Sequence, residues 1–219
     1  MNSETQLDNR LRLCAEFVRP GARAADIGTD HAYLPVWLCR HNICPSAIAA
    51  DVNPEPLSRG RITVAQAGME DKISLRLSDG LAQIAEDEVD DIIIAGMGGE
   101  LIADIITACP YAADKHFILQ PMTKSEALIS RLCANGYIID RQDCCIAGKK
   151  CYTVLSVVYG GTVRQHDELY RYTGELHPRE NETHLRFLRG HIERLRKQAK
   201  GEARFAALAD RLEEFCGNG

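Results

Sequence analysis

The stretch from Asp26 to Leu34 holds the residues whose types and spacing point most directly to chemistry. It reads Asp-Ile-Gly-Thr-Asp-His-Ala-Tyr-Leu and continues a short apolar segment that is typical of a strand. A strand that ends in Asp-x-Gly and leads into a helix forms the nucleotide-binding corner of doubly wound sheets. A dinucleotide site would carry further glycines for the pyrophosphate, but here Gly28 is followed by Asp30. Two carboxylates repel a pyrophosphate and suit the ammonium and sulfonium of S-adenosylmethionine (SAM); an ordinary turn is the alternative.

Acidic residues also end the next two predicted strands. Asp51, followed by Val52, ends the second strand, where a carboxylate accepts hydrogen bonds from ribose hydroxyls in nucleotide-binding sheets. Asp79 and Gly80 end the third strand, where a carboxylate would accept from an adenine amino group. Each aspartate alone also fits a helix cap, but three acidic strand ends in register favour a nucleoside ligand.

Two further strand ends complete the predicted rim. The fourth strand runs into Gly96-Met97-Gly98-Gly99, whose glycines allow close approach to a ligand or flat base, although a tight strand-to-helix turn also explains them. The fifth ends in Gln120-Pro121-Met122-Thr123-Lys124, which adds an amide and a cation. We predict that the cofactor contacts Asp26, Gly28, Asp51, Val52, Asp79, Gly80, Gly96 and Met97. We predict that Asp30, His31, Tyr33 and Gln120 face the second substrate.

Alternating strands and helices between residues 23 and 159 must position these side chains. The expected strands are 23–27, 46–50, 73–77, 91–95 and 116–120, and the expected helices are 34–41, 56–66, 100–109 and 125–135. Such βα repeats imply a parallel sheet covered by helices on both faces. Segments 137–145 and 151–159 have no helix between them, which predicts an antiparallel edge hairpin. This Rossmann-like α/β layout is that of class I SAM-dependent methyltransferases.

The pattern changes after Gly160-Gly161, where helical spacing replaces the βα alternation. Apolar residues recur at helical spacing over 185–199 and again over 205–215, with a break at Gly201. This spacing predicts a helical hairpin of coiled-coil type. The chain should therefore comprise a SAM-dependent methyltransferase domain at 1–161 and a helical domain at 162–219.

Charge and cysteine content narrow the function classes. The net charge is −5, yet residues 184–204 hold seven basic and two acidic residues. Such a stripe favours contact with a polyanion, and a solvated helix face is the alternative. The nine cysteines form no Cys-x-x-Cys pair, so we predict a reducing cytoplasm and no metal site. Apolar runs are too short for a membrane span, and we expect no membrane contact.

Together these segments resemble the bacterial tRNA (adenine-22-N1)-methyltransferases, the TrmK family. The resemblance is carried by ADIGTDHAYLP at 25–35, IAGMGGELI at 94–102, LQP at 119–121 and KCYTVL at 150–155. It implies SAM as methyl donor, N1 of one adenine as acceptor, and tRNA binding by the helical domain. Met122 departs from the family's usual Asn after Leu-Gln-Pro. The alternatives are a SAM-binding RNA-binding protein without catalysis, or a small-molecule methyltransferase.

Overall fold

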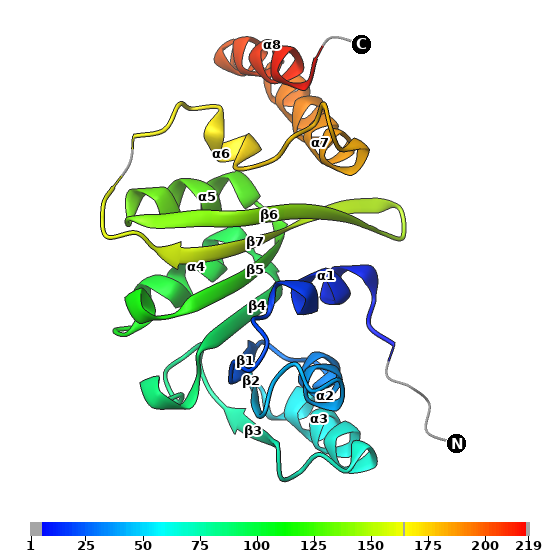
Figure 1. The fold of residues 1–219 in the computed structure, drawn as a ribbon. Coiled ribbons are helices and arrows are strands. Elements are labelled where there is room, and N and C mark those ends of the chain that lie inside the picture. The colour runs from blue at the N-terminus through cyan, green and yellow to red at the C-terminus, as the bar shows by residue number, and fades with distance from the viewer. Residues whose placement is uncertain (1–5, 164, 218–219) are drawn as a thin grey trace.

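The computed structural model describes residues 6–163 and 165–217, and it places a seven-stranded sheet at the centre of the first 160 residues (Figure 1). The strand order is β3-β2-β1-β4-β5-β7-β6. β1 to β5 run parallel, β7 is antiparallel to β5, and β6 is antiparallel to β7. The predicted sheet with an antiparallel edge hairpin is therefore confirmed. The strands are β1 (Ala24–Ile27), β2 (Ala47–Asp51), β3 (Ile73–Leu77), β4 (Asp91–Gly98), β5 (His116–Thr123), β6 (Tyr137–Ala147) and β7 (Lys150–Tyr159).

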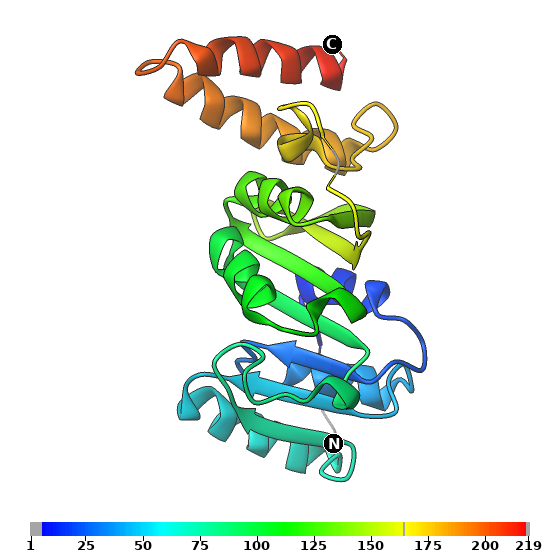
Figure 2. The same ribbon diagram turned by 90° about the vertical axis from the view of Figure 1, so that its left-hand side faces the viewer.

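Helices cover both faces of this sheet, as the turned view in Figure 2 shows. One face carries α1 (Asn9–Phe17), α2 (Tyr33–Arg40) and α3 (Pro54–Ala67), and the other carries α4 (Gly99–Ala108) and α5 (Ser125–Ala134). Short 3₁₀ turns, η1 (Glu86–Glu88) and η2 (Ala112–Asp114), lie in the connections. On β4, Ile92 and Ile94 join one buried cluster and Ile93 joins the other, which explains the uninterrupted apolar run.

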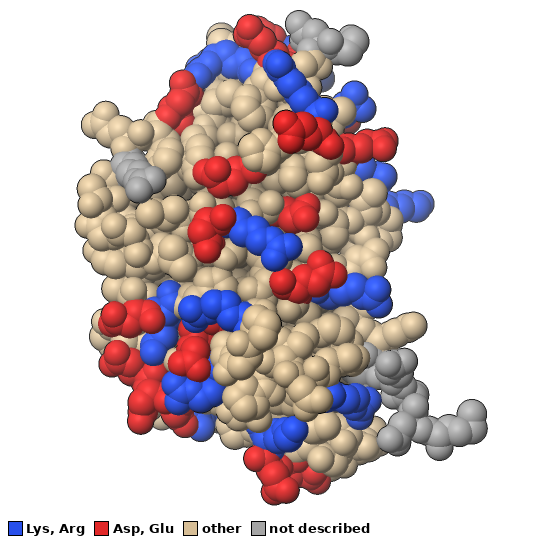
Figure 3. Space-filling model, in the orientation of Figure 1, with Lys and Arg blue, Asp and Glu red and all other residues tan. Residues whose placement is uncertain are grey.

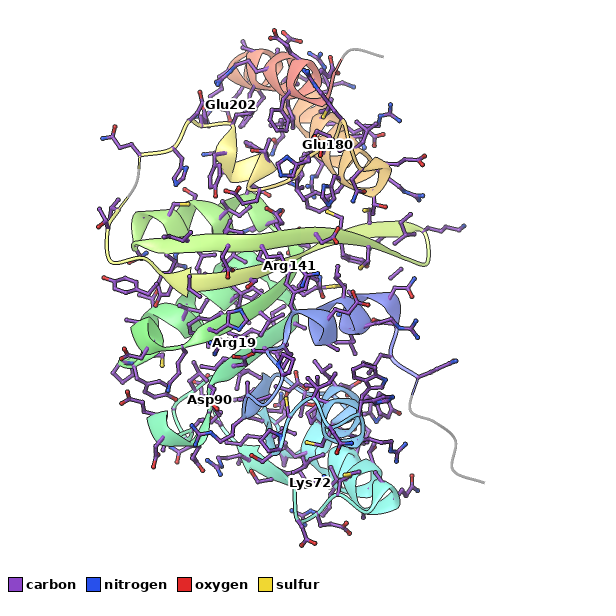
Figure 4. All side chains as sticks on the ribbon, viewed as in Figure 1. Arg19, Lys72, Asp90, Arg141, Glu180 and Glu202 are labelled. Atoms are coloured by element: carbon purple, nitrogen blue, oxygen red, sulfur yellow. The ribbon has the colours of Figure 1, made fainter. Side chains whose placement is uncertain are left out.

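Helix α1 was not among the predicted elements. It begins after Asp8, whose side chain accepts from the backbone N–H of Leu11 at 2.8 Å. At its other end, Arg141 of β6 lies over the Phe17 ring, 4.0 Å from the centroid (Figure 4). Just beyond α1, Arg19 donates to the buried carboxylate of Asp91 through its backbone N–H and its Nε. These contacts hold the end of α1 against β6 and the amino end of β4. The start of α1 lies at the other edge of the sheet, where Arg10 reaches Gln120 near the carboxyl end of β5.

The last part of the described chain forms α6 (Tyr170–Thr173), α7 (Glu182–Gln198) and α8 (Arg204–Cys216). Helices α7 and α8 lie side by side beyond the β6 edge of the sheet, which confirms the predicted helical hairpin (Figures 1 and 2). Their buried cluster includes Leu188, Leu195 and Leu212 from the predicted apolar seam. Cys144 of β6 belongs to the same cluster, so the helical part is packed onto the edge hairpin. The short helix α6 was not predicted.

Candidate active site

The turn after β1 has a backbone conformation that favours glycine at position 28. Gly28 has a φ of +79°, and a Cβ at this position would lie 2.1 Å from Cε of Met97. The N–H groups of Gly28 and Thr29 donate to the carbonyl of Ala50 at 2.8 and 3.0 Å. The Thr29 hydroxyl then accepts from the N–H of Ala32 at 3.1 Å, one residue before α2 begins. The positive φ is what favours glycine here, since the Met97 methyl group is the flexible end of a side chain.

A cavity of about 360 Å³ opens at this turn. Six of the predicted site residues line it, and they are Asp26, Gly28, Asp30, His31, Tyr33 and Gly96. Three residues at the start of α1 also line it, Asp8, Arg10 and Leu11, and none of these was predicted. Their sequence signal was the Asp8 cap among apolar residues at helical spacing, which are Leu7, Leu11, Cys14 and Val18.

The cavity combines a buried carboxylate with a cation. Asp26 is 8% exposed, and burial raises its pKa to about 6, with a further upward contribution from Asp51. Arg10 enters from α1, and its guanidinium donates to Oε1 of Gln120 at 2.8 Å and to Asp8 at 3.0 Å. An amino-acid group that carries both an ammonium and a carboxylate matches such a pair of opposite charges.

Asp30, His31 and Tyr33 form the outer wall of the cavity. The exposed Asp30 carboxylate accepts from Nη2 of Arg59 on α3 at 2.8 Å, and Nε2 of His31 lies 3.4 Å from its other oxygen. The rings of His31 and Tyr33 are stacked, with centroids 5.0 Å apart and planes 6° from parallel. Tyr33 is 41% exposed, so this pair presents a flat aromatic surface to solvent. A nucleobase could stack on such a surface.

The Gln120 amide is hydrogen-bonded within the protein in this structure. The side chain is fully buried, and its Oε1 accepts from Arg10 at 2.8 Å and from the N–H of Gly96 at 3.2 Å. Its Nε2 donates to the carbonyl of Pro121 at 2.9 Å. Both ends of the amide thus have partners within the protein, and its Oε1 joins Arg10 to the Gly96 turn.

The glycine run after β4 has mainly local roles. β4 extends to Gly98 and β5 to Thr123, beyond the predicted ends, because the two strands continue to pair with register shifts around Met97. Gly96 has a φ of +85°, and a Cβ at Gly99 would lie 2.3 Å from the carbonyl oxygen of Lys124. At Gly99, the missing side chain makes room for the backbone of Lys124 rather than for a ligand. Of the three glycines in this run, Gly96 lines the cavity.

The remaining predicted cofactor residues lie outside the lining of this cavity. Asp51 accepts from the N–H of Asn53 at 2.7 Å, and Val52 beside it is 58% exposed. Asp79 and Gly80 line a separate hollow of about 420 Å³ against α4. Met97 is half-buried beside Gly28. The carboxyl ends of β1, β2 and β3 still share one edge of the sheet, where an extended nucleoside would span them.

The described residues contain no group of three or more His, Cys, Asp or Glu side chains that could hold a metal ion. All nine cysteines are free thiols, and six of them are buried. No described helix has the length and apolar character needed to cross a membrane.

Comparisons with known proteins agree with this geometry. The methyltransferase domain family matches residues 7–155. The tRNA (adenine(22)-N(1))-methyltransferase of Bacillus subtilis (strain 168) is 34% identical over 176 residues, which cover 80% of this chain and 74% of that protein. The structure of the B. subtilis M1A22 tRNA methyltransferase TrmK superimposes with a TM-score of 0.84 at 29% identity, over 97% of this chain and 100% of that chain. A Streptococcus pneumoniae protein in complex with S-adenosyl-L-methionine gives 0.88 at 30% identity, over 96% and 100%.

Proposed function

Because this chain belongs to the tRNA (adenine(22)-N(1))-methyltransferase family, we propose that it transfers the methyl group of SAM to N1 of adenine 22 in tRNA. The observation that carries the proposal is the cavity at the end of β1, where Asp26 and Arg10 place opposite charges beside Gly28. We place the enzyme in the cytoplasm, where tRNA is found and where nine free thiols remain reduced.

The residues present fit SAM, which supplies the electrophilic methyl group when bound. Asp26 would accept from its ammonium, and Arg10 would bind its carboxylate. Asp51 and Asp79 would accept from the ribose hydroxyls and the adenine amino group, with Val52 against the adenine face. The low exposure of Asp26 strengthens its attraction for an ammonium, because water screens the charge less than it does at the surface.

The protein's task in the reaction is orientation rather than proton abstraction, because adenine N1 already has a lone pair. His31 and Tyr33 would stack on the target base and align N1 with the methyl group. The amino group of the base becomes more acidic as positive charge develops on the ring. The Asp30 carboxylate or the carbonyls of 97–99 would accept from it. Since N1 lies on the pairing edge, the base must be unpaired or flipped out.

The direct test is mass spectrometry of nucleosides from tRNA incubated with the protein and SAM. The expected product is 1-methyladenosine, mapped to position 22 by comparison with a transcript that carries another base there. An RNA-binding protein without catalysis would give no methylated nucleoside. A small-molecule methyltransferase would leave tRNA unmodified and would show no steep salt dependence of RNA binding.

Asp51→Ala is expected to weaken SAM binding by about 1–3 kcal/mol, which is the contribution of charge-assisted hydrogen bonds to ribose. The fold should survive, because the residue ends a strand and is only partly buried. Titration calorimetry with SAM measures the change. Asp71→Ala removes the same charge at the opposite end of β3 and should bind SAM as the parent does. Unchanged affinity in Asp51→Ala would remove Asp51 from the cofactor site.

Asp30→Ala and Tyr33→Ala are expected to slow methyl transfer by about tenfold to a hundredfold while SAM affinity changes little, since both side chains face the acceptor side. Single-turnover rates at saturating SAM, together with SAM titrations, separate the two effects. Glu55→Ala is the control, because Glu55 also binds Arg59 at 2.8 Å but does not line the cavity. Parent turnover combined with collapsed SAM affinity would show that the acceptor-side assignment is wrong.

A further inference from the structure

A second and larger hollow, of about 650 Å³, lies between the end of β5, the turn of the β6–β7 hairpin and α7. We call it the junction groove. Its lining includes one acidic residue, Glu193, and six basic ones. The basic residues are Lys124, Lys149, Lys150, Arg186, Arg189 and Arg194. Basic side chains are visible along the right-hand edge of the molecule in Figure 3, beside the hairpin turn and α7. The groove is therefore strongly cationic.

Most of this positive charge is not neutralised by the protein. Lys124 binds the Glu100 carboxylate, but the other five cations of the groove form no ion pair within the described part of the chain. Arg186 donates to the backbone carbonyl of Lys149 at 3.3 Å, and Arg194 donates to Nδ1 of His191 at 2.8 Å. Both partners are uncharged acceptors, so these guanidinium groups keep their charge for an external anion.

The opposite side of α7 differs. Arg196 binds the carboxylates of Asp210 and Glu213 on α8, each at 2.7 Å. The basic stripe at 184–204 is therefore split: part of it lines the junction groove, and Arg196 is used to hold the helical hairpin together. The ion pairs of the structure therefore distinguish the cations of the stripe that are available to a polyanion from those that are not.

The walls of the groove are fixed to each other by buried polar contacts. His191 on α7 is 1% exposed, and its Nε2 lies 3.3 Å from the Ser125 hydroxyl at the start of α5. Burial, with the Arg194 charge, lowers the pKa of His191 to about 3, so its ring is neutral at physiological pH. His184 adds a 2.9 Å contact between its Nε2 and Asp143 of β6. The backbone segments that carry the cations on α7 and on the hairpin turn are thus held in one arrangement.

The junction groove also lies next to the cavity at the end of β1, and β5 connects the two. Gln120 bonds to Arg10 and Gly96, both of which line the cavity, and the next two residues, Pro121 and Met122, line the groove. An RNA strand that lies in the groove therefore passes the end of β5. From there, a single base could reach across β5 into the cavity.

On these observations, and resting on the proposed function, we propose that the junction groove holds the ribose-phosphate backbone of the tRNA segment adjoining the target adenosine. Five cations without carboxylate partners suit a row of phosphates, which release counterions when they bind. The cations at the end of α7 and the start of α8, which are Lys197, Lys200 and Arg204, lie outside the groove and are not expected to contact the RNA.

The test compares two full-length triple charge reversals with the parent. The groove variant is Lys149→Glu, Lys150→Glu and Arg189→Glu, whose side chains line the groove without hydrogen bonds to other described residues. The matched control is Lys197→Glu, Lys200→Glu and Arg204→Glu, which makes the same charge change on exposed positions of the predicted stripe. Binding of tRNA is measured at several salt concentrations, alongside SAM affinity by calorimetry.

The groove variant should bind tRNA more than about tenfold more weakly than the parent, and its salt slope should fall by up to about one for each lost phosphate contact. The control should stay within about threefold of the parent, and all three proteins should bind SAM equally. The proposal is overturned if the groove variant binds tRNA as the parent does, in which case the groove serves another partner, such as an acidic protein. It is also overturned if the control loses as much affinity, or if the parent binds no tRNA. Failure of the proposed function is distinct, since it appears as absent 1-methyladenosine in the parent.

Discussion

Asp26→Asn is expected to produce a protein that is more stable than the parent at neutral pH and that binds SAM about ten- to a hundredfold more weakly. Burial raises the pKa of Asp26 from 3.8 to about 6, so the folded state holds a proton that the unfolded state releases between these values. The parent therefore loses stability as the pH rises through this window, by about 2–3 kcal/mol in total. Asparagine removes the charge and hence this cost.

The sign of the effect can be checked with urea unfolding at several pH values. The stability advantage of Asp26→Asn should be smallest near pH 4, should grow as the pH rises, and should level off above pH 7. Asp71→Asn is the comparison, because it removes a charge from an exposed position that does not affect the pKa of Asp26. An advantage that does not vary with pH would mean that ionisation of Asp26 is not its source.

The pH dependence of SAM binding should also reflect the ionisation of the Asp26 carboxylate. An ammonium beside Asp26 favours the ionised form, so binding below about pH 6 must displace a proton. Parent affinity should fall on acidification through that pH, and Asp26→Asn should lack this dependence. Calorimetry in two buffers of different ionisation enthalpy would detect the released proton. The buried Asp26 charge destabilises the free protein, and the ammonium of SAM would compensate it on binding. Such a site is organised for binding rather than for stability.

Local patterns predicted the sheet well because its strands are buried on both faces and end in recognisable turns. Uninterrupted apolar runs such as Ile92 to Ile94 predicted strands buried on both faces, and the alternating helices predicted that these strands run parallel. The register of β1 with β2 and β4 was not predicted and is known only from the structure. The exact ends of β4 and β5 could not be predicted. They depend on pairing between Met97 and Pro121, which only the assembled sheet brings together.

The candidate site was less predictable where it depends on distant contacts. Arg10 and Gln120 are far apart in the sequence, and only the packing of α1 against the sheet joins them. The sequence motif predicted that Gln120 ends β5 near the site, but it did not predict that Arg10 and Gly96 would bond to its amide. The stripe on α7 behaves similarly, because the rotation of α8 decides that Arg196 is paired and that Arg189 is not.

Ending the chain at Gly161 is expected to leave a folded domain that binds SAM but no longer methylates tRNA at a useful rate. The buried residues of the two core clusters of the sheet all lie at or before Val157. Among the described residues after Gly161, the partly buried Tyr170 is the one that packs against these clusters. Removing the helices exposes Cys144 and takes the N–H of Glu175 from the side chain of Gln142. The domain should therefore lose about 1–2 kcal/mol of stability, because modest apolar surface is uncovered.

Loss of tRNA methylation follows from the charges that leave with α7, since three of the six cations of the junction groove lie on that helix. Circular dichroism and SAM calorimetry establish whether the domain is intact, and single-turnover methylation of tRNA then measures what the helices contribute. Parent-level methylation by the shortened chain would show that the catalytic rim alone holds the RNA. A shortened chain that no longer unfolds cooperatively would instead show that residues 162–219 complete the fold of the sheet, as the packing of α7 onto β6 permits.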